Sequence, residues 1–151
     1  VVLTIAGSDP SSGAGVQADL KTFSALGVYG ASVITALTAQ NTTGVFGIHD
    51  VPPAFIASQI DAVFSDLDVG AVKIGMLSQI ATIETVAAGL ERHRQSNVVL
   101  DPVMVATSGD RLLEPAAIER LRTALMPHAR LVTPNIPEAA ALLETADARP
   151  G

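Results

Sequence analysis

The sequence predicts an α/β fold with a largely parallel sheet and helices on both faces. Short, almost entirely apolar runs alternate with segments in which apolar residues recur every three or four positions. Such runs are typical of strands buried on both faces, and the periodic segments are typical of the helices that cover them. Hydrophobic residues make up 48% of the chain and aromatic residues 3%. We expect residues 1–151 to form a single domain.

Apolar runs mark the predicted strands. The five clearest are Val1–Ala6, Ala31–Leu37, Gly70–Ile74, Asn97–Asp101 and Arg130–Thr133, with a further short strand at Phe46–Val51. Apolar residues at helical spacing mark the segments between them, and proline precedes two of these segments, as it often does at a helix start. The predicted helices begin near Gly13, after Pro52-Pro53, at Ile80, after Glu114-Pro115 and at Asn135, where the last runs to Glu144. The chain ends at Arg149–Gly151 in a predicted loop.

In sheets of this kind, ligands bind beyond the carboxyl ends of the strands. The residues that follow the predicted strands are therefore expected to share one rim. They are Gly7 and Asp9, Gln40 and Asn41, Gly75 and Met76, Asp101 to Met104, and Pro134 to Glu138.

A glycine-rich turn, Gly7–Gly15, joins the first strand to the first helix. Strand, turn and helix in this order leave backbone N–H groups free at the helix start, so the turn predicts a ligand cradle. Asp19 follows in the helix and shares a face with Val16 and Phe23. A carboxylate beside an apolar stripe needs a partner, which is either a nearby N–H or lysine, or a ligand.

The same segment resembles a dinucleotide-binding fingerprint but lacks its context. Gly13–Ala18 matches the pattern G-x-G-x-x-G/A. That pattern needs its first glycine at the strand end and an acidic residue roughly 20 positions later. Here Gly7–Ser12 separates the strand from Gly13, and Ser32–Ala36 contains no acid. We therefore reject dinucleotide binding.

Composition narrows the possible partners. The net charge of −6 and the few aromatic residues disfavour nucleic acid. The chain has no cysteine, which excludes disulfides and thiolate metal sites and agrees with a cytoplasmic location. No apolar run approaches the roughly 20 residues of a membrane span, and Val1–Ala6 lacks the basic flank of a signal peptide. We expect a small-molecule ligand, with no nucleic acid and no membrane partner.

Two polar segments at the rim carry residues suited to metal and phosphate. Asp101 ends a predicted strand before Pro102, where its carboxylate would suit a hydrated Mg2+ or simply stabilise the turn. Asn135 and Glu138 have the spacing of a helix capping box. They would also point at the rim that holds Asp101, and the two roles can coexist.

Two other charged residues are expected to have structural roles. Lys73 lies within the apolar run Ala71–Ile74, where an ammonium group needs a partner, so we expect it to pair with a carboxylate. His93 lies among charged residues at a helix end, so we expect it to face solvent.

An ordered set of motifs extends across nearly the whole chain. The segments are Thr4–Pro10, Gly13–Thr22, Tyr29–Ala36, Ala39–Thr42, Val72–Leu77, Asp101–Met104 and Thr133–Ala139. Together they resemble the hydroxymethylpyrimidine/phosphomethylpyrimidine kinases of thiamine biosynthesis, which belong to the ribokinase-like superfamily. The resemblance implies a ribokinase-like fold.

The resemblance also implies a role for individual residues in binding the substrate. Asp19 and Gln40 would hydrogen-bond the aminopyrimidine ring, together with the backbone around Gly7. Met76 and Val103 would pack against the ring.

The cofactors implied by the resemblance are ATP and Mg2+. Asp101 and Glu138 would serve the Mg2+, and Asn135 would help to place the nucleotide phosphates. The implied reaction is phosphorylation of the pyrimidine's hydroxymethyl group, followed by a second phosphorylation of the monophosphate. Members of the family also suggest a homodimer.

Members of this family continue well past the length of this chain, into an ATP-binding half. That half contains a Gly-x-Gly-Cys-type loop with the catalytic group, and nothing after Gly109 resembles it. We therefore expect the substrate-binding part of the fold, truncated at its C-terminal side and without catalytic residues. Such a chain would bind the pyrimidine weakly and turn over poorly. A pyridoxal-type kinase and a non-catalytic pyrimidine-binding module remain alternatives.

Overall fold

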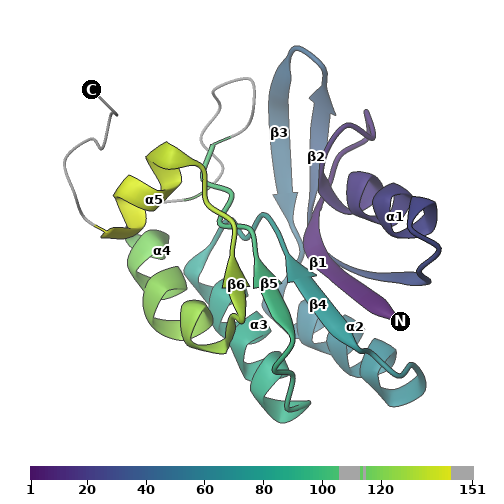
Figure 1. Ribbon diagram of the computed structural model, residues 1–151. Coiled ribbons are helices and arrows are strands. Elements are labelled where there is room, and N and C mark those ends of the chain that lie inside the picture. Colours follow the sequence, from purple (N-terminus) through teal and green to yellow (C-terminus); the bar gives the residue numbers. More distant parts are fainter. Residues whose placement is uncertain (106–112, 114, 144–151) are drawn as a thin grey trace.

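The computed structural model describes residues 1–105, 113 and 115–143, and Figure 1 shows their arrangement. The described strands form one sheet in the order β3-β2-β1-β4-β5-β6. They are β1 (Val2–Ser8), β2 (Gly30–Asn41), β3 (Gly44–Asp50), β4 (Ala71–Ile74), β5 (Val98–Leu100) and β6 (Leu131–Val132). Neighbouring strands are parallel except β2 and β3, which are antiparallel. The largely parallel sheet predicted from the apolar runs is confirmed.

Helices lie on both faces of this sheet, as predicted (Figure 1). They are α1 (Gly15–Ala25), α2 (Pro53–Asp66), α3 (Ile80–Arg92), α4 (Pro115–Arg120) and α5 (Ile136–Leu143). Successive side chains of β1 point to opposite faces. Leu3 and Ile5 are fully buried in the core shared with α2 and α3, whereas Thr4 between them contacts Asp19 of α1. Within the described residues, no helix is long and apolar enough to cross a bilayer.

Strand β2 is longer than predicted, because it continues past Leu37 to Asn41. Its second half pairs with β3 in an antiparallel hairpin in which Asn41 lies opposite Gly44. This half is held by its hydrogen bonds to β3 and is not buried on both faces. It therefore contains polar residues and lacks the apolar run by which the other strands were predicted. As a result Gln40 is a strand residue and does not belong to a loop after the strand.

The first and fourth helices also differ from the predictions. Helix α1 begins at Gly15, where φ is +59° and a Cβ atom would lie 2.4 Å from the carbonyl oxygen of Gly7. Glycine is therefore needed at this position. Helix α4 passes into a π-helical turn at Leu121–Leu125 and a 3-10 turn at Met126–His128. The expected flank at Glu114, the helix end at Glu144 and the loop at 149–151 lie outside the described residues.

The prediction that His93 faces solvent is wrong. Its ring stacks on Phe64 with centroids 4.5 Å apart, and its Nε2 lies 2.9 Å from the carboxylate of Asp61. Hydrogen bonds from His93, and then from Arg92, hold the pKa of Asp61 below its ordinary value. The cluster joins α2 to the end of α3. It depends on the packing of two helices, which the charges around His93 in the sequence do not reveal.

Candidate active site

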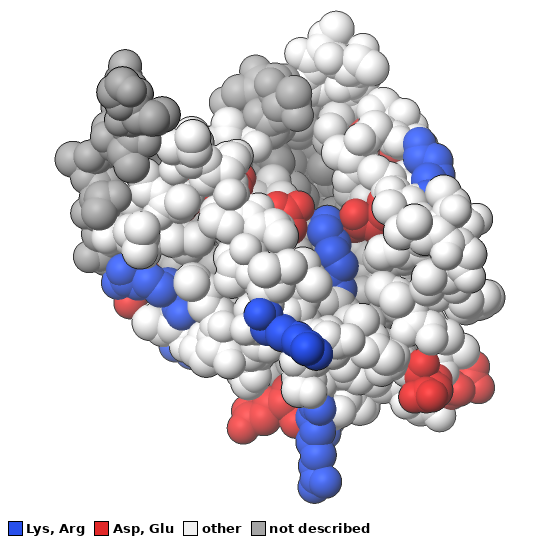
Figure 2. All heavy atoms as spheres, in the orientation of Figure 1, with Lys and Arg blue, Asp and Glu red and all other residues white. Residues whose placement is uncertain are grey.

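A cavity of about 510 Å3 lies at the carboxyl ends of β1, β2, β4 and β5. Figure 2 shows that this face of the molecule is hollowed near its middle, where acidic and basic side chains meet. Six of the residues predicted to bind substrate or metal line the cavity: Gly7, Asp19, Gln40, Met76, Asp101 and Val103. They come from separate parts of the chain, and the parallel sheet brings them together because its strands end at one rim.

Three backbone amides of the first turn are bonded within the chain and are not available to a ligand. Asp9 is 3% exposed, and its carboxylate accepts hydrogen bonds from the N–H groups of Ser11 (2.8 Å), Gly13 (3.0 Å) and Ala14 (2.8 Å). The Ser11 hydroxyl donates to the same carboxylate at 2.7 Å. The chain's own carboxylate therefore occupies the space beside these three amides. The turn forms a wall of the cavity.

These hydrogen bonds also lower the pKa of Asp9. Burial by itself would raise the pKa of the carboxyl group, because desolvation penalises the ionised form. The hydrogen bonds from Ser11, Ala14 and Gly13 outweigh this effect, and the pKa of Asp9 lies below its ordinary value of 3.8. Asp9 is therefore ionised at neutral pH and keeps the turn closed.

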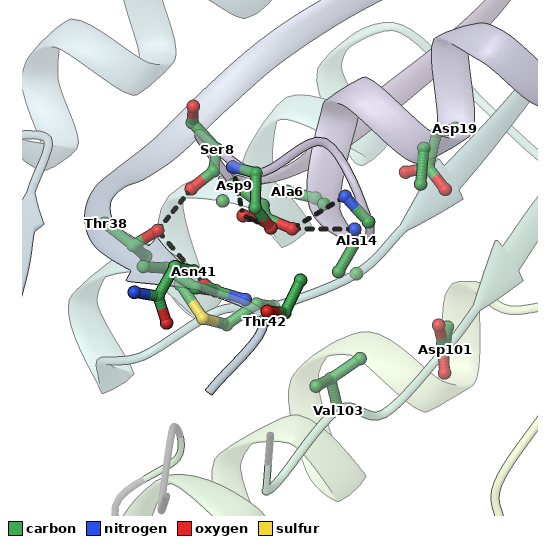
Figure 3. A pocket seen from close by; sticks show the side chains of 18 of the residues that line it. Ala6, Ser8, Asp9, Ala14, Asp19, Thr38, Asn41, Thr42, Asp101 and Val103 are labelled. Atoms are coloured by element: carbon green, nitrogen blue, oxygen red, sulfur yellow. Dashed lines mark hydrogen bonds between the residues drawn. The ribbon is translucent and has the colours of Figure 1, made fainter. Parts of the chain in front are cut away.

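Asp19 and Asp101 share one cation. Lys73 Nζ lies 3.1 Å from Asp19 Oδ1 and Oδ2, and 3.6 Å from Asp101 Oδ2. The Thr4 hydroxyl donates to Asp19 Oδ2 at 2.6 Å. The predicted pairing of Lys73 with a carboxylate is confirmed. Two carboxylates beside one ammonium leave a net negative charge at this end of the cavity, where Figure 3 shows both of them.

Two apolar side chains form part of the cavity lining. Met76 is 8% exposed and lines the cavity, as does Val103. The position of Met76 depends on Gly7, since a Cβ atom there would lie 2.6 Å from the Met76 Cε atom. Because Gly7 has no side chain, Met76 can lie beside the backbone of β1.

The opposite end of the cavity carries uncharged polar groups. Thr38, Gln40, Asn41 and Thr42 line it, and Figure 3 shows Thr38, Asn41 and Thr42 away from Asp19 and Asp101. Thr38 was not among the predicted site residues. Its position two residues before Gln40 could have indicated it, because alternate residues of a strand share a face.

Asn135 and Glu138 form the predicted capping box but do not line the cavity. The Asn135 N–H donates to Glu138 Oε2, and the Glu138 N–H donates to Asn135 Oδ1, both at 2.9 Å. Glu138 is buried. Within the described ranges, no group of three or more histidine, aspartate or glutamate side chains is placed to hold a metal ion. The structural role of these two residues is confirmed, and their metal and phosphate roles remain predictions.

Comparison with known families decides where the chain belongs. The phosphomethylpyrimidine kinase family model matches residues 9–149. The chain belongs to this family. A hydroxymethylpyrimidine/phosphomethylpyrimidine kinase of Salmonella typhimurium LT2 is 61% identical over 147 residues, which cover 97% of this chain and 55% of that protein. The chain therefore spans about half the length of this curated relative.

Solved structures support the same assignment. A phosphomethylpyrimidine kinase of Clostridium difficile 630 matches with a TM-score of 0.91 and 51% identity, covering 98% of this chain and 64% of that one. A pyridoxal kinase of Staphylococcus aureus in complex with AMP-PCP matches with a TM-score of 0.83 and 36% identity, covering 97% and 54%. These neighbours confirm the ribokinase-like fold, and the chain is a member of a kinase family.

Proposed function

We propose that the protein phosphorylates 4-amino-5-hydroxymethyl-2-methylpyrimidine and then its monophosphate, with ATP as the phosphoryl donor, in thiamine biosynthesis. One observation carries the proposal: all five residues predicted for the pyrimidine, and Asp101 from the metal side, line one cavity of about 510 Å3. Membership of the phosphomethylpyrimidine kinase family supports it.

The chemistry of the lining fits a small, flat, polar ring. A volume of about 510 Å3 lies within the usual range for small-molecule sites. Met76 and Val103 supply apolar surface for the ring faces, and Gln40 and Asp19 supply polar groups at opposite ends for its edges. Polar groups at both ends would fix the orientation of the ring, and with it the direction of its hydroxymethyl group.

Asp101 is suited to an Mg2+ ion that accompanies ATP. Its side chain is 35% exposed and lines the cavity, and Mg2+ is usually held by one or two carboxylates together with waters and phosphates. Glu138 would be the second carboxylate, although one of its oxygens accepts the Asn135 N–H. Asn135 would help to place the phosphates. The bound ion would neutralise charge on the phosphates during transfer.

Phosphoryl transfer forms a bond from the substrate's hydroxymethyl oxygen to the γ-phosphorus and breaks the bond from that phosphorus to the β,γ-bridging oxygen. The hydroxyl proton is lost, and ADP leaves. Catalysis of this kind depends mainly on positioning and charge stabilisation. We assign the positioning of the pyrimidine to residues 1–151. We assign the rest of ATP binding, and proton removal, to the remaining length that the relatives have.

The test uses the complete gene product that contains this chain. Purified protein is given ATP, Mg2+ and either the hydroxymethylpyrimidine or pyridoxal, and phosphorylated products are measured. We expect Asp19→Asn to raise KM for the pyrimidine about tenfold, through loss of one charged hydrogen bond. We expect Asp101→Asn to lower kcat about 100-fold or more and to change the Mg2+ response. Asp66→Asn, at the exposed end of α2, is the matched control.

The outcomes separate the candidate functions. A strong preference for pyridoxal would overturn the assignment of Asp19 and Gln40 to a pyrimidine and favour a pyridoxal-type kinase. Pyrimidine binding by the complete product without turnover, measured by calorimetry, would favour a non-catalytic binding module. If both variants lose activity equally, and only in proportion to the folded protein that they lose, then Asp19 and Asp101 have structural roles.

A further inference from the structure

Thr38 contacts two acceptor oxygens although it has one proton to give. Its Oγ1 atom lies 2.7 Å from the carbonyl oxygen of Ser8 and 3.1 Å from the side-chain amide atom of Gln40 assigned as Oε1. Figure 3 shows both contacts of Thr38. A hydroxyl group donates one hydrogen bond and accepts others, whereas a backbone carbonyl only accepts. The two contacts cannot both be donated by Thr38.

The Ser8 carbonyl is the group that accepts this proton. The contact is the shorter of the two, and the carbonyl has no proton of its own with which to satisfy Thr38. Ser8 is also held firmly, because its hydroxyl accepts from Gln17 Nε2 at 2.8 Å and Gln17 Oε1 accepts the Asp9 N–H at 2.8 Å. Thr38 must therefore accept from Gln40.

Gln40 can donate to Thr38 if its amide is turned by half a rotation. That rotation exchanges the amide oxygen and nitrogen and leaves the rest of the side chain in place. Nε2 then faces Thr38 and donates to it, and Oε1 takes the other position. Gln40 lines the cavity, and its second amide atom has no hydrogen-bond partner among the described residues. The carbonyl oxygen is then the atom available to a ligand.

We propose that Thr38 is a positioning residue that orients the Gln40 amide, so that this end of the cavity presents an acceptor and selects a ring with an exocyclic amino group. The inference rests on the proposed function for the identity of the ring. An amino group at this position donates to Oε1. A ring with an oxo group there would place two acceptors together, which costs binding free energy because neither is satisfied.

Neutron diffraction from D2O-exchanged crystals of the ligand-free complete gene product tests the orientation directly. Deuterium on the Gln40 amide atom that faces Thr38, and on Thr38 Oγ1 toward Ser8, would support the proposal. Deuterium on the atom that faces away from Thr38 would overturn it. This measurement needs no substrate, so it decides the role of Thr38 even if the proposed function fails.

Ligand selectivity supplies the second measurement. Calorimetry would compare the 4-amino pyrimidine with its 4-oxo analogue in the wild type, Thr38→Val and Thr38→Ser. We expect the wild type and Thr38→Ser to prefer the amino ring by about tenfold, as one hydrogen bond allows. In Thr38→Val the amide can turn freely, and the preference should fall to about threefold or less. An unchanged preference in folded Thr38→Val would overturn the inference. Failure of the wild type to bind either ring would instead overturn the proposed function.

Discussion

Lys73 Nζ lies 3.1 Å from the carboxylate of Asp19, although 54 positions separate the two residues in the sequence. Thr4 of β1 is paired in register with Lys73 of β4, and its hydroxyl donates to the same carboxylate. Two adjacent strands therefore present a donor each to one residue of α1. The side chain of Asp19 is 16% exposed and that of Lys73 is 23% exposed, so water screens the pair only in part.

Replacement of Lys73 should destabilise the protein more than loss of a surface ion pair. In Lys73→Met, two carboxylates lose their shared cation, and we expect the free energy of unfolding to fall by about 1–3 kcal/mol. Arg92→Met removes an exposed partner of Asp61 and should cost less than about 1 kcal/mol. Urea unfolding monitored by circular dichroism measures both. Equal losses in the two variants would contradict the expectation that partial burial makes the Lys73 pair stronger than a surface pair.

The closed turn around Asp9 should make stability depend on pH. Because the folded-state pKa of Asp9 lies below its ordinary value of 3.8, its contribution is complete above that pH and is lost as the pH falls through the folded-state value. We expect Asp9→Asn to cost about 2 kcal/mol at neutral pH. The difference from the wild type should shrink below pH 3.8.

Urea unfolding between pH 7 and pH 3 checks this expectation for Asp9. Ser11→Ala removes the hydroxyl donor to the Asp9 carboxylate and keeps the amide donor. It should therefore reproduce part of the loss of stability seen in Asp9→Asn. If the difference in unfolding free energy between the wild type and Asp9→Asn stays constant across this pH range, the expectation is wrong.

Two glycines with positive φ allow backbone strain to be separated from crowding. Gly15 has φ +59°, and a Cβ atom there would lie 2.4 Å from the Gly7 carbonyl oxygen. Gly27 has φ +73°, and a Cβ atom there would meet nothing within 4 Å. We expect Gly27→Ala to lose about 1 kcal/mol from backbone strain and Gly15→Ala to lose about 1–3 kcal/mol more. Thermal or urea unfolding of both variants measures the difference, and similar losses would mean that the turn can move away from the added methyl group.

Alanine at Gly7 should weaken ligand binding more than it weakens the fold. The added Cβ meets the flexible end of Met76 rather than backbone, so the methionine can move, but it then enters the cavity. We expect a change in stability within about 1 kcal/mol and a loss of pyrimidine affinity of about tenfold. The double variant with Met76→Leu lacks the Cε atom and should recover part of the affinity. If Gly7→Ala binds as tightly as the wild type, Met76 does not pack against the ring.

Local patterns were sufficient for much of the fold and for several of the residues that line the cavity. The apolar runs identified each strand, since strands buried on both faces need apolar side chains along their length. The capping box of Asn135 and Glu138 was also readable, because all of its atoms lie within four residues. The hairpin half of β2, the position of Thr38 and the stacking of His93 on Phe64 were not predicted. Each depends on a partner that the local sequence does not identify.

Residue types and their spacings were enough to predict the α/β class and a rim with Gly7, Gln40, Met76 and Asp101, because they reflect burial along each strand and the turn after it. The ordered motifs indicated the family, and the family comparison showed it. The packed structure was needed to show which partners occupy the polar groups of the cavity. The pairing register places Lys73 between two carboxylates, and the fold of the first turn places the Asp9 carboxylate against its own amides. Hydrogen bonds act over about 3 Å, so they depend on positions that only packed strands and helices define.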